Sequence, residues 1–187
     1  MGRLTGVIAV REYFLQSPRL GFSIWTHADL PLALELWGDP EVTRLTGGPF
    51  TAHQVRMRLE LEINNHEEHG VQYWPIFLLE TGKHVGCCGL QPHKPTEGIY
   101  ELGFQLRVEY WGRGFAREAA EAVVARAFTT LDIPALYAGH HPDNQASRGV
   151  LTHLGFQYTH DEFYPPTGEI EPCYLLLRRE FLGFSAP

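Results

Sequence analysis

Basic residues are scarce in this sequence of 187 residues. It has 15 lysines and arginines against 22 acidic residues, which gives a net charge of −7 at pH 7 with neutral histidines. A protein that binds nucleic acid through its phosphates needs the opposite sign, so we expect no nucleic-acid partner. The negative balance suits a cationic partner such as an amine, and it suits simple solubility equally well.

Cysteines and long apolar segments are also few. The three cysteines, Cys87, Cys88 and Cys173, are odd in number and two of them are adjacent, so a disulfide framework is not expected. No apolar run approaches the ~20 residues that a membrane span needs. Residues 1–13 lack the continuous apolar stretch and the cleavage site of a signal peptide. These absences predict a cytoplasmic protein that does not enter a membrane.

Apolar side chains are present in sufficient number for a large core. Hydrophobic residues make up 44% of the sequence and aromatic residues 12%, which excludes an intrinsically disordered chain. The length fits a single domain over residues 1–187.

Periodicity and turn residues predict a mixed α/β fold. Thr26 with Asp29, and Thr51 with Gln54, have the spacing of capping boxes, which start helices. The turn at 38–40 (GDP) is expected to end the first of these helices. The predicted strands are residues 20–25, 74–80, 84–91, 99–107, 135–140, 155–160 and 172–179, and two further helices are predicted at 115–131 and 145–154.

One segment of this pattern also predicts an anion site. Residues 110–114 (YWGRG) connect a strand to the helix 115–131. The first N–H groups of a helix have no partner within it, and the helix dipole adds partial positive charge there. Gly112 and Gly114 allow close backbone approach or a positive φ, although glycines at such a place serve a simple turn equally well. The strand–helix–strand order implies one parallel pair in a largely antiparallel sheet.

Four motifs follow one another in the second half of the chain. They are ELGF at 101–104, EYWGRGFA at 109–116, NQASR at 144–148 and LGF at 154–156. Together they resemble the GNAT superfamily of N-acetyltransferases, and more narrowly its RimJ/RimL-like branch, which includes ribosomal-protein N-terminal acetyltransferases. The opening motifs SPRL at 17–20 and LWGDPEV at 36–42 are similar to that branch as well, so the resemblance covers residues 17–180.

The resemblance implies a fold and a co-substrate. It implies a mixed, mostly antiparallel sheet, flanked by helices, in which one parallel strand pair splays apart and acetyl-CoA lies in the gap. Residues 99–107 and 135–141 match those two strands. Splayed strands leave backbone groups without partners, and the pantetheine arm can supply them. The matching positions are the backbone of Leu106, Arg107 and Val108 for the arm, and Gly112, Arg113, Gly114, Phe115 and Ala116 for the pyrophosphate.

Two further positions in the resemblance concern the co-substrate. The superfamily loop usually begins with Gln or Arg where this chain has Trp111, so any side-chain help with phosphate must come from Arg113, Arg117 or elsewhere. Asn144 is either a helix cap or a contact to the cofactor arm. The resemblance implies that Ser147, one turn into that helix, is within reach of the thioester sulfur.

The chemistry of acetyl transfer sets what a catalytic residue must do. The attacking amine must be neutral, and a lysine-type amine is neutral about once in 2500 molecules at pH 7, a cost of ~4.6 kcal/mol. An α-amine is neutral about one time in seven, a cost of ~1 kcal/mol. A strong base is therefore valuable for a lysine or polyamine and dispensable for a protein N-terminus. The leaving thiolate benefits from a proton donor.

Glu101 is the candidate base, because the superfamily often carries a glutamate in this strand. A solvated strand residue or salt-bridge partner is the competing interpretation. Many relatives place a tyrosine acid four residues before the Gly-Phe pair, and this chain has Leu151 there, which cannot donate a proton. Ser147 or a water is the substitute, or no acid is used. Tyr100, Tyr137 and His141 are weaker possibilities.

Metal and covalent mechanisms are not expected from the sequence. His140 and His141 are neighbours on a strand and face opposite ways, so they cannot easily hold one ion, and no Cys/His spacing resembles a zinc site. Cys87 and Cys88 are interpreted as small buried residues. The acidic residues of the second helix, Glu60, Glu62, Glu67 and Glu68, are interpreted as a solvated face.

The sequence thus predicts an enzyme that transfers an acetyl group from acetyl-CoA to a primary amine by direct attack in a ternary complex. The acceptor is either a protein N-terminus or a small-molecule amine, and the protein is expected to be a monomer or a homodimer. The alternative is a CoA-binding sensor or scaffold without turnover, in view of the missing tyrosine.

Overall fold

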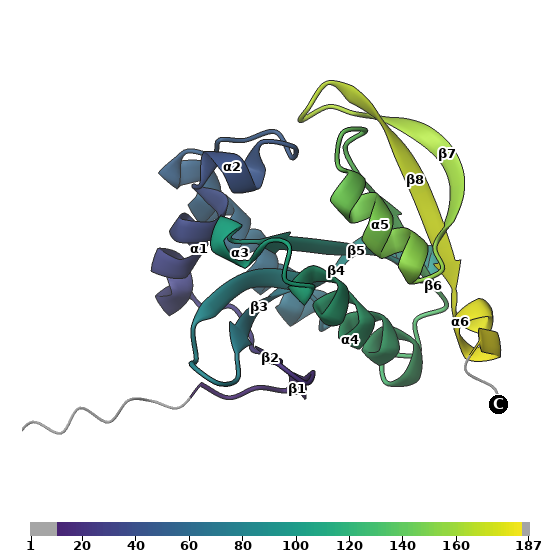
Figure 1. The fold of residues 1–187 in the computed structure, drawn as a ribbon, viewed down its shortest axis with the longest axis horizontal. Helices are drawn as coiled ribbons and strands as arrows, with labels where there is room; N and C mark the ends of the chain where they lie inside the picture. The colour runs from purple at the N-terminus through teal and green to yellow at the C-terminus, as the bar shows by residue number, and fades with distance from the viewer. Residues whose placement is uncertain (1–10, 185–187) are drawn as a thin grey trace, which may run out of the picture.

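In the computed structural model, which describes residues 11–184, one eight-stranded sheet forms the centre of the fold (Figure 1). Its strands follow the order β1-β2-β3-β4-β5-β6-β8-β7. The strands are β1 Leu15–Gln16, β2 Leu20–Phe22, β3 Tyr73–Leu78, β4 His84–Lys94, β5 Ile99–Leu106, β6 Ala135–Gly139, β7 Gln157–Tyr164 and β8 Glu169–Leu177. The helices are α1 Leu30–Trp37, α2 Pro40–Thr43, α3 Ala52–His69, α4 Phe115–Thr129, α5 Gln145–His153 and α6 Arg178–Phe184, with short 3-10 turns at His27–Asp29, Pro95–Glu97 and Val108–Tyr110.

The parallel pair predicted from the strand–helix–strand order is β5 and β6. Every other pairing in the sheet is antiparallel. β5 and β6 pair only from Ile99 to Glu101 and from Ala135 to Tyr137, although β5 continues to Leu106. Within the described residues, no strand pairs with 102–106 on the β6 side. The predicted splay in a mixed, mostly antiparallel sheet is therefore confirmed.

The predicted helix starts are also confirmed. The Thr51 hydroxyl accepts a hydrogen bond from the Gln54 N–H at 3.3 Å, and Gly70 follows α3 with a left-handed φ of 70°. The Thr26–Asp29 capping box is present too, but it begins a 3-10 turn that continues into α1.

The turn at 38–40 was predicted only as a helix end, and here the structure adds an element. Asp39 caps the short helix α2, since its side chain accepts from the N–H groups of Glu41 and Val42. Proline at the first position of that helix needs no hydrogen-bond donor. The same three residues thus end α1 and start α2.

The closing hairpin is longer than the sequence pattern indicates. β7 runs from Gln157 to Tyr164, and every residue in it is exposed. Because neither face of β7 is buried over its length, hydrophobic alternation gives no signal for it. In Figure 1 the β7–β8 hairpin extends beyond the rest of the sheet and its tip points toward the α2 end of the molecule.

Two hydrophobic clusters lie against the sheet. The larger one packs α4 against the strands, and the smaller one packs α1 and α3. Cys88 belongs to the larger cluster and Cys87 to the smaller, as expected for neighbours in a strand. Both are fully buried, which confirms their predicted burial.

Some features bear on partners and location. None of the described helices is long and apolar enough to cross a membrane. Residues 1–10, which belong to the segment where the sequence indicates no signal peptide, lie outside the described residues.

Candidate active site

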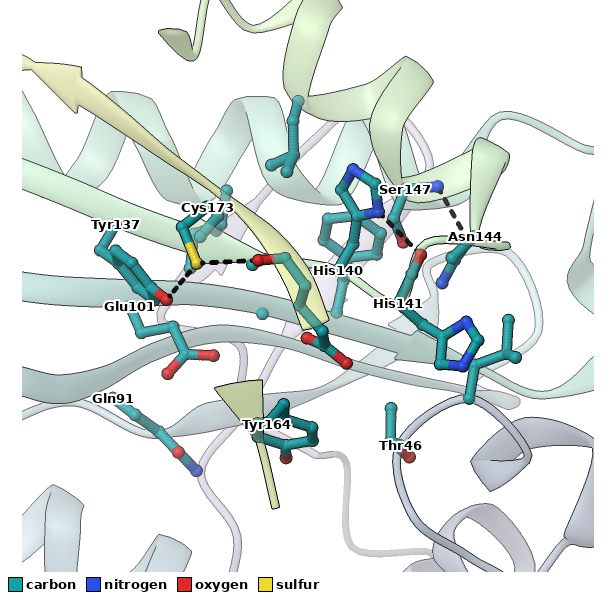
Figure 2. Close-up of a pocket in the computed structure, with 18 of the residues that line it drawn as sticks. Thr46, Gln91, Glu101, Tyr137, His140, His141, Asn144, Ser147, Tyr164 and Cys173 are labelled. Atoms are coloured by element: carbon teal, nitrogen blue, oxygen red, sulfur yellow. Dashed lines mark hydrogen bonds between the residues drawn. The ribbon is translucent and has the colours of Figure 1, made fainter. Parts of the chain in front are cut away.

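A cavity of about 370 Å³ lies where β5 and β6 separate. Glu101 and Tyr137, the last paired residues of the two strands, line it together with Asn144 and Ser147 of α5. Figure 2 shows Glu101 and Tyr137 toward one end of the cavity and Asn144 and Ser147 toward the other. The splay therefore brings the predicted base and the predicted α5 residues to one cavity.

Glu101 is held in place from β3. The Tyr73 hydroxyl donates a hydrogen bond to Glu101 Oε1 at 3.1 Å. Burial raises the pKa of the Glu101 carboxyl, and the bond from Tyr73 offsets part of this effect. A carboxylate with a raised pKa is a better proton acceptor than a solvated one. Glu101 is only partly exposed at the cavity wall and is bonded to Tyr73, so it is not a freely solvated strand residue.

Tyr73 reaches Glu101 because Gly103 has no side chain. A Cβ at position 103 would overlap the Tyr73 ring, which lies across β5. The glycine of the ELGF motif therefore provides the space that lets a β3 tyrosine contact the β5 glutamate. Tyr73 was not predicted as a site residue, since nothing in the local sequence pattern marks this cross-strand contact.

Glu62 is buried, contrary to its assignment to a solvated helix face. Its side chain is 0% exposed, and its Oε2 accepts from the Tyr73 backbone N–H at 2.7 Å. Oε1 accepts from Gln91 Nε2 at 2.7 Å and lies 3.8 Å from Arg58. Burial raises the pKa of Glu62 to about 7. Position 62 is three residues after Leu59, which packs in the smaller cluster, so helical spacing places Glu62 next to the buried face of α3.

At the α5 end of the cavity, Asn144 is a helix cap. Its Oδ1 accepts from the Ser147 N–H at 3.0 Å, so the cap interpretation holds and the side chain still faces the cavity. Leu151 is 2% exposed and forms part of the same wall, where it offers no proton. Ser147 is therefore the hydroxyl that α5 presents at this end of the cavity.

Two histidines and a tyrosine complete the β6 wall. His140 is buried, with Nε2 at 3.3 Å from the Tyr174 hydroxyl and Nδ1 at 2.9 Å from the His141 carbonyl. His141, one of the weaker candidate acids, lines the cavity, and His140 does so as well. The Tyr137 hydroxyl lies 2.9 Å from Cys173 Sγ, and burial raises the pKa of Tyr137, which keeps that hydroxyl protonated.

The fold also brings together three side chains able to ligate a metal. The ligand atoms of His160, Glu162 and Cys173 lie within 4.8 Å of one another. The expectation that no metal binds was based on the spacing of residues along the chain. The β7–β8 pairing brings Cys173 next to His160 and Glu162, which that spacing does not show. Cys173 Sγ is already in contact with the Tyr137 hydroxyl.

The loop before α4 has the geometry of an open helix start. Gly112 and Gly114 have φ of 69° and 78°. Gly114 is the N-cap of α4 and provides no side-chain cap, and a Cβ at Gly112 would meet nothing within 4 Å. No side chain of the described residues caps α4, so its first N–H groups keep no side-chain partner, as an anion site requires.

Three arginines surround this loop. Arg113 lies over the Phe115 ring at 5.3 Å, and Arg117 contacts His153 at 2.9 Å. Arg19, which the sequence analysis did not assign to the loop, stacks on Phe115 at 4.3 Å and donates to the Arg113 carbonyl at 3.2 Å. Its place in SPRL, almost 100 residues away, gave no indication of this contact.

The end of β5 explains the tryptophan at the first loop position. Trp111 Nε1 donates to the Leu106 carbonyl at 2.8 Å, which ties the loop to the strand. The Arg107 N–H donates to the Val85 carbonyl, and the Arg107 side chain pairs with Glu35 at 2.6 Å. Arg107 therefore directs its backbone N–H to β4, away from the gap. Val108, the first residue of the turn before the loop, is 39% exposed.

Comparison with known sequences places this geometry in a family. Residues 19–157 match the acetyltransferase (GNAT) domain. The chain is 30% identical to the N-acetyltransferase p20 of Bacillus licheniformis over 83% of this chain and 90% of that protein. It is 29% identical to the FsC-acetyl coenzyme A-N(2)-transacetylase of Aspergillus fumigatus over 92% of this chain and 80% of that protein.

Solved structures show the same fold. An acetyltransferase from Agrobacterium tumefaciens superposes with a TM-score of 0.74 at 28% identity, covering 89% of this chain and 98% of that one. RimL, a ribosomal alpha-N-protein acetyltransferase solved in complex with coenzyme A, superposes with a TM-score of 0.74 at 18% identity, covering 86% of this chain and 95% of that one. At 18% identity, the similarity to RimL shows a shared fold alone.

Proposed function

Since this chain belongs to the GNAT acetyltransferase family and is thus an acetyl-CoA-dependent N-acetyltransferase, we propose that it transfers the acetyl group to a primary amine by direct attack in a ternary complex. The two acceptor classes expected from the sequence are a protein N-terminal α-amine and a small-molecule amine. One observation supports the proposal above the rest: a cavity lined by Glu101 lies where β5 and β6 separate, and β5 leads from it through the glycine loop into the start of α4.

The residues around the gap fit the co-substrate. The open first turn of α4, with Gly112 and Gly114, suits a pyrophosphate. The positive charge of Arg113 adds to the helix dipole there. The gap beside Leu106 and Val108 suits the pantetheine arm, whereas the Arg107 N–H is already bonded to the Val85 carbonyl and the Arg107 side chain to Glu35. Phe115 and Ala116 form the first turn itself.

Glu101 takes the proton that the amine must lose. The amine nitrogen then bonds to the acetyl carbon while the carbon–sulfur bond breaks. Because the amine and acetyl-CoA are held side by side, their proximity supplies most of the rate advantage. Tyr73 fixes the Glu101 carboxylate, so the base meets the amine in one orientation.

Ser147 is the proposed donor to the departing sulfur. It lines the cavity at the end of α5 whose N–H groups are capped by Asn144. Leu151 has no proton to give at the position where relatives have tyrosine. In this assignment the first proton taken by Glu101 passes to solvent. After the attack the nitrogen carries a second excess proton, which Glu101 accepts in turn, and the proton taken up by sulfur comes from the serine hydroxyl, which regains one through water.

The test is acetyl-CoA turnover with a panel of amines, followed through release of free coenzyme A thiol. Glu101→Gln is expected to lower kcat/KM by at least about 100-fold, the usual contribution of general base catalysis. Calorimetry should show coenzyme A binding to that variant unchanged. Glu97→Gln, which alters an exposed carboxylate in the turn before β5, is the matched control and should have little effect.

Two results would contradict the proposal. Unchanged rates for Glu101→Gln would remove that residue as the base. Tight coenzyme A binding without turnover on any amine of the panel would instead support the sensor interpretation.

A further inference from the structure

The cavity carries more carboxylate than acetyl transfer requires. Besides Glu101, its lining includes Glu162 of β7 and Glu171 of β8. These two glutamates are direct partners across the hairpin. Like charges placed opposite each other in an antiparallel pair destabilise the sheet. Glu162 already has His160 at 3.6 Å and accepts a hydrogen bond from the Tyr137 hydroxyl at 3.3 Å, whereas Glu171 has no ion pair among the described residues.

The need for a counter-charge is greater at Glu171. It is 8% exposed, and the bond that its Oε1 accepts, from the Thr167 hydroxyl, is long at 3.5 Å. Among the described residues, Oε2 has no hydrogen-bond partner, and it lies 3.7 Å from the place that a Cβ of Gly139 would occupy. Gly139 ends β6, so this oxygen is directed over the strand at the gap. A carboxylate oxygen that faces the cavity without a protein partner is available to a cationic ligand, which would form a charge-assisted hydrogen bond with it.

In the described part of the chain, neither Arg58 nor His141 forms a hydrogen bond with Glu171 Oε2. Arg58 lies at the cavity but pairs with the buried Glu62 and stacks over Trp37 at 5.0 Å. His141 is close enough to Glu171 to lower its pKa, yet no hydrogen bond joins them in the described part of the chain. Burial, the larger effect, raises the pKa of Glu171.

The cavity also limits the size of the acceptor. The hairpin tip meets the loop before α3, since a Cβ at Gly47 would lie 2.7 Å from the Pro166 carbonyl oxygen. Leu45 and Thr46 of that loop, and Tyr164 of the hairpin, line the cavity below this contact. Its volume of about 370 Å³ is near the lower end of the roughly 300–1,000 Å³ of small-molecule sites. The acetyl-bearing thiol must share that space.

We propose that Glu162 and Glu171 form a subsite for a second cationic group, so that the acceptor is a small amine with two positive charges and not a protein N-terminus. This inference rests on the proposed acetyl transfer. One amine of the acceptor faces Glu101 and loses its proton, while the other remains an ammonium between the paired glutamates. Aromatic rings of Tyr137 and Tyr164 flank the alkyl chain between them.

The experiment compares three kinds of acceptor at equal pH and ionic strength. They are the diaminoalkanes with three to five carbons, n-butylamine, and a C-terminally amidated tetrapeptide with neutral side chains. For the wild-type protein, kcat/KM for the preferred diamine should exceed that for n-butylamine by at least about tenfold, which corresponds to about 1.4 kcal/mol. The peptide should be the poorest acceptor.

Two variants locate the subsite. Glu171→Gln should lower the ratio of diamine to monoamine kcat/KM about tenfold, mainly through KM. Glu162→Gln should lower the same ratio by a smaller factor, because its side chain is 57% exposed. Glu162 also provides a second probe if the other variant folds poorly. Glu169→Gln, an exposed carboxylate on the same strand and outside the cavity lining, is the matched control and should leave the ratio unchanged.

The outcomes separate this inference from the proposed function. Equal kcat/KM for diamine and monoamine, or faster acetylation of the peptide, would overturn the dication subsite and leave acetyl transfer to an amine intact. An unchanged ratio in both glutamate variants would overturn the subsite as well. No coenzyme A release with any acceptor would overturn both.

Discussion

Among residues 11–184, one hydroxyl orients the Glu101 side chain. The Tyr73 hydroxyl donates to the carboxylate, and hydrogen bonding to a charged form lowers its pKa, in this case against the larger effect of burial. Gly103 makes the contact possible by leaving room for the ring. Tyr73 is thus a positioning residue for the proposed base.

Replacing this tyrosine should be visible in the pH profile. In Tyr73→Phe the Glu101 pKa rises, so the acidic limb of the kcat/KM profile moves to higher pH, and kcat/KM at neutral pH falls about tenfold through the lost charged hydrogen bond. Steady-state rates across pH 5 to 9 provide the measurement. Tyr100→Phe, one position before Glu101 on the same strand, is the control. A profile that drops in height without moving would assign Tyr73 a structural role alone.

For single residues, the sequence indicates those that lie in recognisable motifs. It gives no sign of those that come together only when the chain folds. Glu101, Ser147 and the loop glycines stand in local patterns that can be recognised along the chain. Tyr73 comes from a strand 28 residues from Glu101, and its role exists only through the β3–β4–β5 register. Glu171 similarly gains its significance from its partner on β7.

Among the elements, the start of α4 offers the clearest test. Gly112 and Gly70 have nearly the same backbone, with φ of 69° and 70°, and neither would place a Cβ within 4 Å of other atoms. Gly70 lies at the end of α3, far along the chain from the proposed phosphate site. The two glycines therefore separate backbone strain from ligand binding.

Alanine at each position should cost about 1 kcal/mol of folding free energy, because both leave a non-glycine residue in the left-handed region. Only Gly112→Ala should also weaken coenzyme A binding, by about tenfold, since the open approach to the α4 N–H groups is lost. Urea unfolding and calorimetry measure the two effects separately. Equal coenzyme A affinity in both variants would contradict the placement of the pyrophosphate at this loop.

The elements themselves were predicted where periodicity or caps are strong. The four main helices and the strands of the sheet centre follow from capping boxes, glycines and alternation. α2 has only four residues, and β7 buries neither face, so neither produces a pattern of sufficient length. Tertiary pairing with β8, rather than intrinsic preference, sets the length of β7.

For the molecule as a whole, the buried Glu62 couples stability to pH. Its folded pKa of about 7 lies above the ordinary value of 4.5, so the folded protein binds this proton more tightly than the unfolded chain. The free energy of unfolding therefore falls as pH rises from about 4.5 to about 7, by about 3 kcal/mol from this group.

Glu62→Gln removes this dependence. The difference in unfolding free energy between variant and wild type should shift in favour of the variant by about 3 kcal/mol between pH 4.5 and pH 8, whatever the loss of the Arg58 contact costs at both. Urea titrations at the two pH values measure it. Parallel stability curves for the two proteins would show that Glu62 is ionised in the fold without penalty.

The whole-molecule arrangement was predicted in outline: one mixed sheet, its parallel pair and the gap between the strands of that pair. The cavity walls were not, because they combine six strands, α3, α5 and the loop before α3, and no local signal reports that convergence. The long hairpin that meets this loop is the part of the fold for which sequence periodicity is weakest.

The three cysteines of the chain are all buried and unpaired, and burial raises the pKa of Cys87 to about 12. Thiolates, the reactive form, are therefore almost absent from the native protein. A chromogenic sulfhydryl reagent added during turnover should report coenzyme A alone, with negligible background from the enzyme. In denaturant the same reagent should react with all three cysteines. The same assay therefore measures coenzyme A release during turnover and, in denaturant, the protein concentration.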